Sequence, residues 1–246
     1  MDRSLYIAMS GAKQTLVAQT ANSNNLANAQ TTGFKSDFEQ FRSMPVFGPG
    51  YPTRVYAMAE RPGSDMAMGP LQTTGNDLDV AVKGDGWLAV ETNDGNEAYS
   101  RSGDLRITPT GRLENGAGLA VMGNSGPIVL PPADKIDIGN DGTISIIPIG
   151  GKATDVAVID RIKMVKPELT NLEKLNDGLM HTKDGSVLDA SAEVGLVQGA
   201  LEGSNVNAVS ALVEMIELAR NFELQTKVMK NADDNSGVSA KLMQMA

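Results

Sequence analysis

The sequence predicts an α+β fold, in which N- and C-terminal α-helices pair as a coiled-coil-like stalk and a mainly antiparallel β-domain lies between them in the chain. Apolar residues recur at alternating spacings of three and four over residues 5–28 and 206–233, which is the period of an amphipathic helix. Residues 76–200 instead contain short alternating runs separated by glycine-containing turns. We therefore expect a helical domain built from both ends, residues 1–34 and 201–246, and a central β-domain.

The N-terminal helix is predicted from a row of residues that would face a partner helix. Thr31, Thr32 and Gly33 should end this helix, because glycine adopts a left-handed turn without steric cost. The predicted row consists of Leu5, Met9, Ala12, Leu16, Gln19, Ser23 and Leu26.

Residues 35–75 lose the helical period and are rich in proline and glycine. We expect an extended linker, since a loop of this length inside a domain is usually functional or ordered by a partner. More than half of the chain's aromatic residues fall in or next to it. These rings require a surface to cover, on this chain or on a neighbour.

The β-domain is predicted from short runs of strand-forming residues with hairpin turns between them. The turns are NDG at 93–95 and 140–142 and KDG at 183–185. The runs are residues 78–82, WLAV (87–90), LRIT (105–108), TISII (143–147) and DVAVID (155–160).

The C-terminal helix is predicted to begin after a cap at Ser204 or Asn205 and to weaken at residues 233–237. Its apolar row follows the same alternation of three and four. The row consists of Leu212, Met215, Ala219, Phe222, Thr226 and Met229.

The composition excludes several classes of protein. A net charge of −9 and a pI near 4.7 argue against nucleic-acid binding, which relies on clustered Lys and Arg. The chain has no cysteine, so disulfides and thiol chemistry are absent. No apolar run is long enough to insert into a membrane, and residues 1–10 do not have the pattern of a secretory signal.

Three motifs suggest chemistry, but each is better explained by a turn. GNSGP (123–127) resembles the surroundings of a serine nucleophile, yet His181 is the only histidine and no third group can be identified. GDGWLA (84–89) loosely matches a dinucleotide loop but continues into a strand instead of a helix. DIGNDG (137–142) has the wrong ligands for calcium. We expect no catalytic residue, no metal and no cofactor, and a surface or turn position for His181.

Two terminal helices alone bury too little apolar surface to offset the entropy of ordering them. A helical bundle within one chain is the alternative for such rows, but burial between chains is favoured here. The side-chain amides of Asn22, Asn24, Asn25 and Asn28 could bond across subunits or simply cap the helix end. Both interpretations stay open at this point.

Motifs along the chain resemble bacterial flagellar axial proteins of the rod and hook family. The resemblance covers nearly the whole chain in one order. Its start, MDRSLYIAMSGAKQ (1–14), and RVYAMAERPG (54–63) resemble a proximal-rod subunit most, with a distal-rod subunit as the alternative. The other motifs are NNLANAQTTGFK (24–35), GPLQTTGNDLDVAVKGDGWLAV (69–90), YSRSGDL (99–105), GRLENGAGLAVMGNSGPIVLP (111–131), DGTIS (141–145) and RNFELQTKVMK (220–230).

The resemblance implies a non-enzymatic subunit of the periplasm-spanning drive shaft, which transmits torque from rotor to hook. It further implies export by the flagellar type III apparatus without a cleaved signal, and polymerisation with copies of itself and other rod proteins. The residues expected at the assembly interface are Leu5, Met9, Ala12, Leu16, Asn24, Asn25, Leu26, Asn28, Gly33, Phe34, Asn205, Val206, Leu212, Met215, Ile216, Arg220, Phe222 and Met229.

Two other classes of function remain as alternatives. An enzyme or carbohydrate-binding β-domain on a helical oligomerisation stalk would require a pocket with converging polar groups. A secreted adhesin-like fibre protein would also polymerise, but it would not need the rod motifs.

Overall fold

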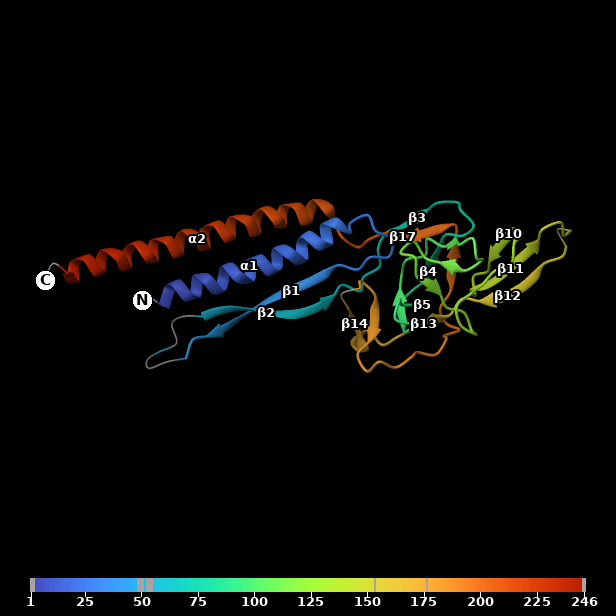
Figure 1. The fold of residues 1–246 in the computed structure, drawn as a ribbon, viewed down its shortest axis with the longest axis horizontal. Helices are drawn as coiled ribbons and strands as arrows, with labels where there is room; N and C mark the ends of the chain where they lie inside the picture. The colour runs from blue at the N-terminus through green and yellow to red at the C-terminus, as the bar shows by residue number, and fades with distance from the viewer. Residues whose placement is uncertain (1–2, 48–50, 52–54, 153, 176, 245–246) are drawn as a thin grey trace. The chain divides into compact units, whose positions relative to one another are not determined.

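The computed structural model describes residues 3–47, 51, 55–152, 154–175 and 177–244. The chain divides into two compact units, each of which we describe by itself (Figure 1). The helical unit contains Met1–Ala29, Asp37–Asp65 and Val206–Ala246, and the β unit contains Gln30–Ser36 and Met66–Asn205.

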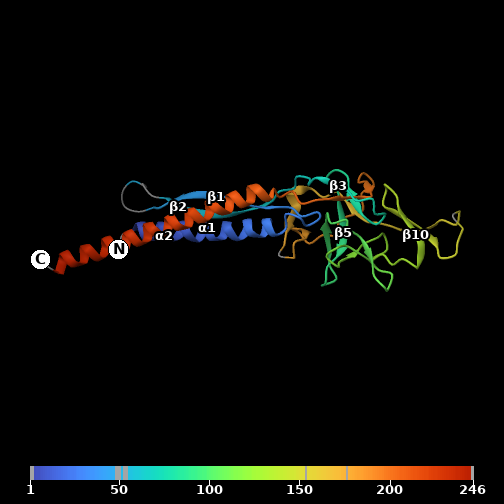
Figure 2. The same ribbon diagram turned by 90° about the horizontal axis from the view of Figure 1, so that it is seen from above.

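The helical unit consists of two long helices and one β-hairpin. Helix α1 spans Arg3–Ala27 and helix α2 spans Ala208–Gln244, while strands β1 (Asp37–Pro45) and β2 (Val55–Ser64) form the hairpin. The helices lie side by side and the hairpin lies along α1 (Figures 1 and 2). They are antiparallel, because the end of α1 meets the start of α2: Asn22 bonds to Ala211.

Helix α2 corrects two details of the prediction. Asn207, and not Ser204 or Asn205, caps it: the Asn207 Oδ1 accepts the backbone N–H groups of Val209 and Ser210 at 3.0 and 3.1 Å. The helix also continues past residues 233–237 to Gln244. No proline interrupts this stretch, and a glycine such as Gly237 costs a helix only about 1 kcal/mol.

The β1–β2 hairpin corrects the expectation that residues 35–75 form a linker without regular structure. The strands pair antiparallel from Asp37↔Ser64 to Pro45↔Val55. The register shifts between Phe38 and Gln40, opposite the position of Pro62. A bulge tolerates a proline that cannot donate to the ladder, and this explains why the sequence pattern of the strands is hard to recognise.

The β unit is antiparallel throughout its named strand pairs, as predicted. Its largest sheet has the order β14-β15-β6-β5-β9-β8-β7, with β13 paired to β5, and the other sheets are β10-β11-β12, β16-β4 and β17-β3. The strands are β3 (Leu71–Thr73), β4 (Val80–Val82), β5 (Trp87–Glu91), β6 (Glu97–Ser100), β7 (Arg106–Ile107), β8 (Leu113–Glu114), β9 (Ala120–Val121), β10 (Ala133–Ile138), β11 (Thr143–Pro148), β12 (Ala157–Arg161), β13 (Met164–Val165), β14 (Leu172–Lys174), β15 (Met180–Thr182), β16 (Leu196–Gln198) and β17 (Ala200–Glu202), with a 3₁₀ turn at Leu169–Asn171.

The β unit has a continuous core of aliphatic side chains contributed by most of its sheets. Leu88, Leu113, Ile144 and Leu196 are among its fully buried members. A second cluster surrounds Trp87 and includes Tyr99 and Met180. The turns at residues 93–95, 140–142 and 183–185 lie between strands, and their glycines have positive φ. This unit therefore carries its own hydrophobic core.

Candidate assembly interface

Helix α2 faces α1 through a row of buried and half-buried residues, which we call the inner row of α2. Its positions alternate by four and three residues, so they share one side of the helix. Met215, Phe222 and Met229 were predicted in this row, whereas Leu212 lies outside it and is exposed. The inner row consists of Ala211, Met215, Leu218, Phe222, Gln225, Met229 and Ala232.

The facing row of α1 lies mostly at other positions than those we predicted, although the predicted Ala12 is buried. Met9 and Leu16 are exposed, while small residues take the positions toward α2. A Cβ on Gly11 would come within 3.1 Å of the Gln225 side chain, so the two helices approach closely there. Small side chains permit that approach, and a pattern of large apolar residues cannot reveal it. This inner row of α1 consists of Ala8, Gly11, Thr15, Ala18 and Asn22.

Two asparagines of α1 bond within the chain. The Asn22 Nδ2 donates to the carbonyl oxygen of Ala211 at 2.8 Å and is buried. The Asn25 side chain exchanges two hydrogen bonds of 2.9 Å with the backbone of Asp37 at the start of β1. The Asn28 Nδ2 donates to the carbonyl oxygen of Asn24. The amides of Asn22 and Asn25 thus join α1 to α2 and to the hairpin.

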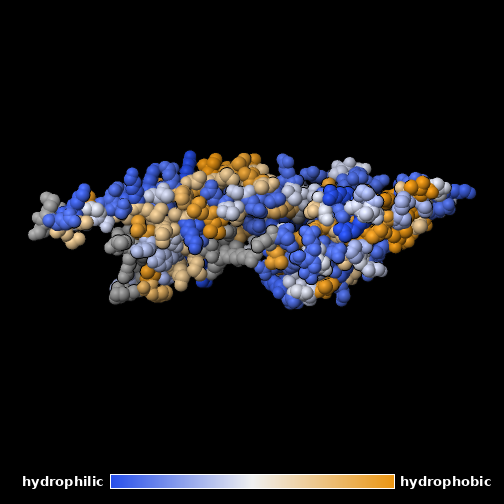
Figure 3. Space-filling model, in the orientation of Figure 1, coloured by the Kyte–Doolittle hydropathy of each residue, from blue (hydrophilic) through white to orange (hydrophobic). Residues whose placement is uncertain are grey.

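The opposite side of α2 carries a second apolar row, which we call the outer row. At about 100° per residue these positions lie nearly opposite the inner row. Each is exposed, and Ile216 keeps 56% of its surface open. Hydrophobic side chains gather over the first half of α2 in Figure 3. The outer row consists of Val209, Val213, Ile216 and Leu224, with Arg220 between the third and fourth members.

Helix α1 and the hairpin also expose large apolar side chains. Met9 and Leu16 of α1 are exposed and lie outside its inner row. The hairpin adds Phe38, Phe41 and other exposed apolar groups. The other exposed apolar side chains of α1 and of the segment from β1 to β2 are Tyr6, Val17, Met44, Phe47, Tyr51, Val55 and Met58.

The helical unit scarcely has a core of its own. Among its described side chains, the buried apolar groups are four alanines and Leu218. Burying a large aliphatic side chain is worth about 1.5–3 kcal/mol, and alanine contributes far less. Such a unit leaves many of its large apolar side chains exposed, and exposed apolar patches mark interaction sites. The four alanines are Ala8, Ala12, Ala18 and Ala211.

The other predicted interface residues are divided between the two units. Gly33 lies in the β unit in a left-handed turn with φ +67°, as predicted. Phe34 also lies there, with the Lys174 Nζ 4.0 Å from its ring centroid. In the helical unit Leu5, Leu26 and Val206 are half-buried, and Asn24 and Arg220 are exposed. Asn205 binds the backbone of the β unit through its Oδ1, which accepts the Ser36 N–H at 2.8 Å.

A buried charge cluster escaped the sequence analysis. Glu202, at the end of β17, lies 2.7 Å from the Lys35 Nζ and 2.8 Å from the Arg101 Nη1, and all three are almost fully buried. Burial alone raises the pKa of Glu202, but the Lys35 hydrogen bond, the Arg101 charge and the Gly69 N–H outweigh it and hold that pKa below its usual range. The three residues are far apart in sequence. The only sequence signal that could have indicated the cluster is the position of Lys35 in a recognised motif.

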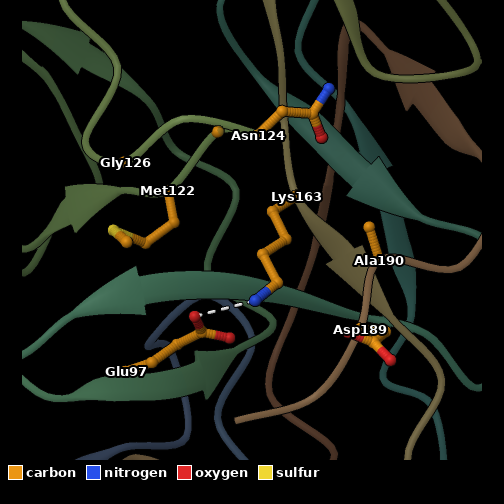
Figure 4. Close-up of a pocket in the computed structure, with 8 residues that line it drawn as sticks. Glu97, Met122, Asn124, Gly126, Lys163, Asp189 and Ala190 are labelled. Atoms are coloured by element: carbon orange, nitrogen blue, oxygen red, sulfur yellow. Dashed lines mark hydrogen bonds and ion pairs between the residues drawn. The ribbon is translucent and has the colours of Figure 1, made fainter.

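A hollow of about 360 Å³ lies on the β unit (Figure 4). Lys163 reaches into it and pairs with Glu97 at 2.8 Å. Asn124 and Gly126 of the GNSGP motif line one side, whereas His181 is not among the lining residues. The hollow thus contains an ion pair between Lys163 and Glu97 and not a nucleophile beside a base.

The motifs that suggested chemistry form ordinary structure. GNSGP makes a tight turn closed by the Met122↔Pro127 bridge, and residues 84–85 turn between β4 and β5. His181 belongs to strand β15, not to a turn, and bonds to Asp177 at 2.8 Å. Within the described residues, no cluster of His, Asp and Glu could hold a metal ion, and no helix is both long and apolar enough to span a membrane.

Comparison with protein families matches three segments of the chain in order. Residues 5–35 match the flagella basal body rod protein model, and residues 81–146 match the flagellar hook protein FlgE/F/G D1 domain. Residues 197–242 match the flagellar basal body rod FlgEFG protein C-terminal model. The first and last models cover α1 and α2, and the middle model falls in the β unit.

Relatives of known identity are similar over the whole chain. The flagellar basal-body rod protein FlgF of Escherichia coli K12 is 42% identical, and that of Salmonella typhimurium LT2 is 41% identical, each over 100% of both chains. FlgG of Bacillus subtilis 168 is 30% identical over 95% of this chain and 96% of its own. The chain belongs to the flagellar basal-body rod protein family, whose members are structural rod components and not enzymes. Within that family its similarity is greater to these two FlgF proteins than to this FlgG.

Proposed function

We propose that this chain is a structural subunit of the flagellar proximal rod, which polymerises through its terminal helices with copies of itself and with other rod proteins. The observation that carries the proposal is the near absence of a core in the helical unit, whose buried apolar groups among the described side chains are four alanines and Leu218. A unit that exposes its large apolar groups is stabilised by covering them. Family membership supports other rod subunits as the surface that covers them.

The two apolar rows of α2 support a specific mode of assembly. The inner row is used within the chain, against α1, and the outer row is left for neighbours. A helix that is apolar on two opposite sides is typical of a buried position between other helices. Met9 and Leu16 on α1, together with the exposed hairpin residues, then cover adjacent subunits.

A continuous tube of such subunits would transmit torque from the rotor to the hook across the periplasm. Membership of the rod protein family supports this role, because a rod made of many similar subunits distributes a twisting load over all the contacts between them. The family also supports delivery by the flagellar type III export apparatus. A distal-rod role is the alternative. The 42% identity with FlgF of Escherichia coli, against 30% with FlgG of Bacillus subtilis, supports a role like that of FlgF.

Charged substitutions on the open faces of the helices test the proposal. Leu16→Asp and Ile216→Asp each place a charge at an exposed apolar position, so the isolated chain should fold while rod assembly and motility are lost. Assembly is measured by isolating basal bodies from cells that carry each variant. Folding of the purified chain is measured by far-UV circular dichroism, which reports the helices, together with the fluorescence of Trp87, which reports the β unit.

Asn221→Asp is the matched control, because it adds the same charge at an exposed polar position of α2 outside both rows. We expect it to assemble normally. Rods that form at the wild-type level with Leu16→Asp and Ile216→Asp would show that these faces are not the interface.

A further inference from the structure

The chain passes between its two units four times. The passages follow residues 29, 36, 65 and 205, so the β unit begins or ends at Gln30, Ser36, Met66 and Asn205. The segments of the β unit next to these passages are residues 30–36, 66–70 and 202–205. We call them the crossing segments, and all the contacts described below lie within the β unit.

The buried carboxylate of Glu202 joins the crossing segments to one another. Its Oε1 accepts the Lys35 Nζ at 2.7 Å and the Gly69 N–H at 3.0 Å. Its backbone carbonyl accepts the Gly33 N–H at 2.8 Å. The same Lys35 Nζ also donates to the carbonyl oxygen of Ala67 at 2.7 Å. One residue therefore bonds to both of the other segments.

Asn205 repeats this linkage at the last passage. Its Oδ1 accepts the Ser36 N–H at 2.8 Å, and its own N–H donates to the carbonyl oxygen of Phe34 at 3.3 Å. Its Nδ2 donates to the carbonyl oxygen of Ala67 at 3.3 Å. The crossing segments are thus bonded in every pairwise combination.

Arg101 connects this arrangement to the core of the β unit. It follows strand β6, and its Nη1 donates to the Glu202 Oε2 at 2.8 Å while its Nη2 donates to the carbonyl oxygen of Gly84. Its guanidinium lies 5.2 Å from the ring centroid of Trp87 on β5. The carboxylate therefore holds the crossing segments on one side and the central strands on the other.

The backbones of the crossing segments also pack closely against each other and against the residues that follow β6. A Cβ on Gly69 would overlap the carbonyl of Gly203, and a Cβ on Gly33 would overlap the backbone of Arg101 and Ser102. A buried charge cannot be left without its partners, because the low-dielectric interior makes it costly. Loss of one bond in the cluster therefore weakens the others.

We infer that the buried cluster around Glu202 fastens all four passages of the chain, so that the crossing segments are held, and are released, together. If the chain carries torque as proposed above, the cluster transmits that torque to the β unit through all four passages of the chain at once. The fastening itself is a property of the single chain and does not depend on polymerisation.

Amide hydrogen exchange of the full-length chain tests the inference with Glu202→Gln, which keeps the shape of the side chain and removes its charge. We expect the amides of Gly33, Ser36, Gly69, Gly203 and Asn205 to exchange at least about tenfold faster, and by a similar factor, because one opening exposes them all. The amides of β5 and β11 should keep their wild-type rates. Glu193→Gln is the control, since Glu193 is an exposed partner of Lys166.

Two results would overturn the inference. One is wild-type exchange in the crossing segments, and the other is acceleration confined to one segment or shared equally with β5 and β11. If Glu202→Gln does not fold, Lys35→Met takes its place, because it leaves the Arg101–Glu202 pair intact and should release the same amides. Because the measurement uses the unassembled chain, its failure is distinct from a failure of the assembly variants.

Discussion

Asn22 donates a hydrogen bond of 2.8 Å from its Nδ2 to the carbonyl oxygen of Ala211, and this buried bond joins the last turns of α1 to the first turn of α2. The Ala211 position is otherwise apolar, so the amide specifies where along α2 the end of α1 must lie. A polar contact inside a small-residue row sets a register that alanines alone leave undefined.

Replacement of Asn22 by alanine should weaken the pairing of the two helices. The buried Ala211 carbonyl loses a partner, which costs about 1–2 kcal/mol. The helical far-UV circular dichroism signal should disappear at a lower urea concentration, while Trp87 fluorescence, which reports the β unit, keeps its midpoint. Asn24→Ala serves as the control, because Asn24 is exposed on the same helix. Equal urea midpoints for the two variants would contradict the role of Asn22.

Gly33→Ala should destabilise the β unit much more than the same change at Gly75. Both glycines have positive φ, +67° and +74°, but a Cβ at Gly75 meets nothing within 4 Å, whereas at Gly33 it overlaps the Arg101 backbone. We expect a loss of about 1 kcal/mol at Gly75 from backbone strain alone and at least about 3 kcal/mol at Gly33. Urea unfolding followed by Trp87 fluorescence measures both, and a similar loss at the two positions would refute the close approach.

Acid should remove the stabilisation contributed by Glu202. Burial raises the pKa of this carboxyl, but Lys35, Arg101 and the Gly69 N–H together lower it further than burial raises it. A lowered folded-state pKa contributes stability above the unfolded value, about pH 4, and that contribution is lost as the pH falls through the folded value.

The free energy of unfolding of the wild type should therefore fall more steeply with acid than that of Glu202→Gln. Trp87, the only tryptophan, lies beneath Arg101 and reports the transition. Parallel curves for the two proteins between pH 5 and pH 3 would exclude a folded-state role for the Glu202 charge.

Alkali should act on the β unit through Tyr99. Burial raises the pKa of this phenol to about 12, and its oxygen accepts the Leu188 N–H at 2.9 Å. A raised folded-state pKa contributes stability that is complete below the unfolded value, about 10, and is lost as the pH rises toward 12. Wild type should lose about 2 kcal/mol more than Tyr99→Phe between pH 9 and pH 12. No difference between the two unfolding curves would show that Tyr99 ionises as freely in the folded state as in the unfolded one.

The sequence predicted the two helices and the antiparallel β-domain because their periods differ and persist over long segments. Met215, Phe222 and Met229 of its predicted row on α2 are half-buried. On α1 it selected Met9 and Leu16, because a periodicity argument favours large apolar residues. Where two helices meet closely, the contact instead belongs to Ala8, Gly11 and Ala18.

The hairpin and the buried charge cluster could not be predicted for a different reason. The bulge opposite Pro62 shifts the register of β1 and β2, so the alternation of the strands is broken. The cluster unites Lys35, Arg101 and Glu202 only through tertiary structure. Each of these charges looks like an ordinary solvated residue in the sequence, and burial cannot be inferred from its neighbours.

Cysteine accessibility on the outer row of α2 tests the central claim most directly. The chain has no cysteine, so Ile216→Cys introduces a single thiol at a position that is 56% exposed in the chain. Asp94→Cys, in an exposed turn of the β unit, is the matched control. The rate of reaction with a maleimide is compared between purified chains and isolated rods. We expect both thiols to react rapidly in the free chain, and in rods only the thiol at position 216 to be protected by at least about tenfold. A thiol at position 216 that reacts equally fast in both states would contradict burial of the outer row between subunits.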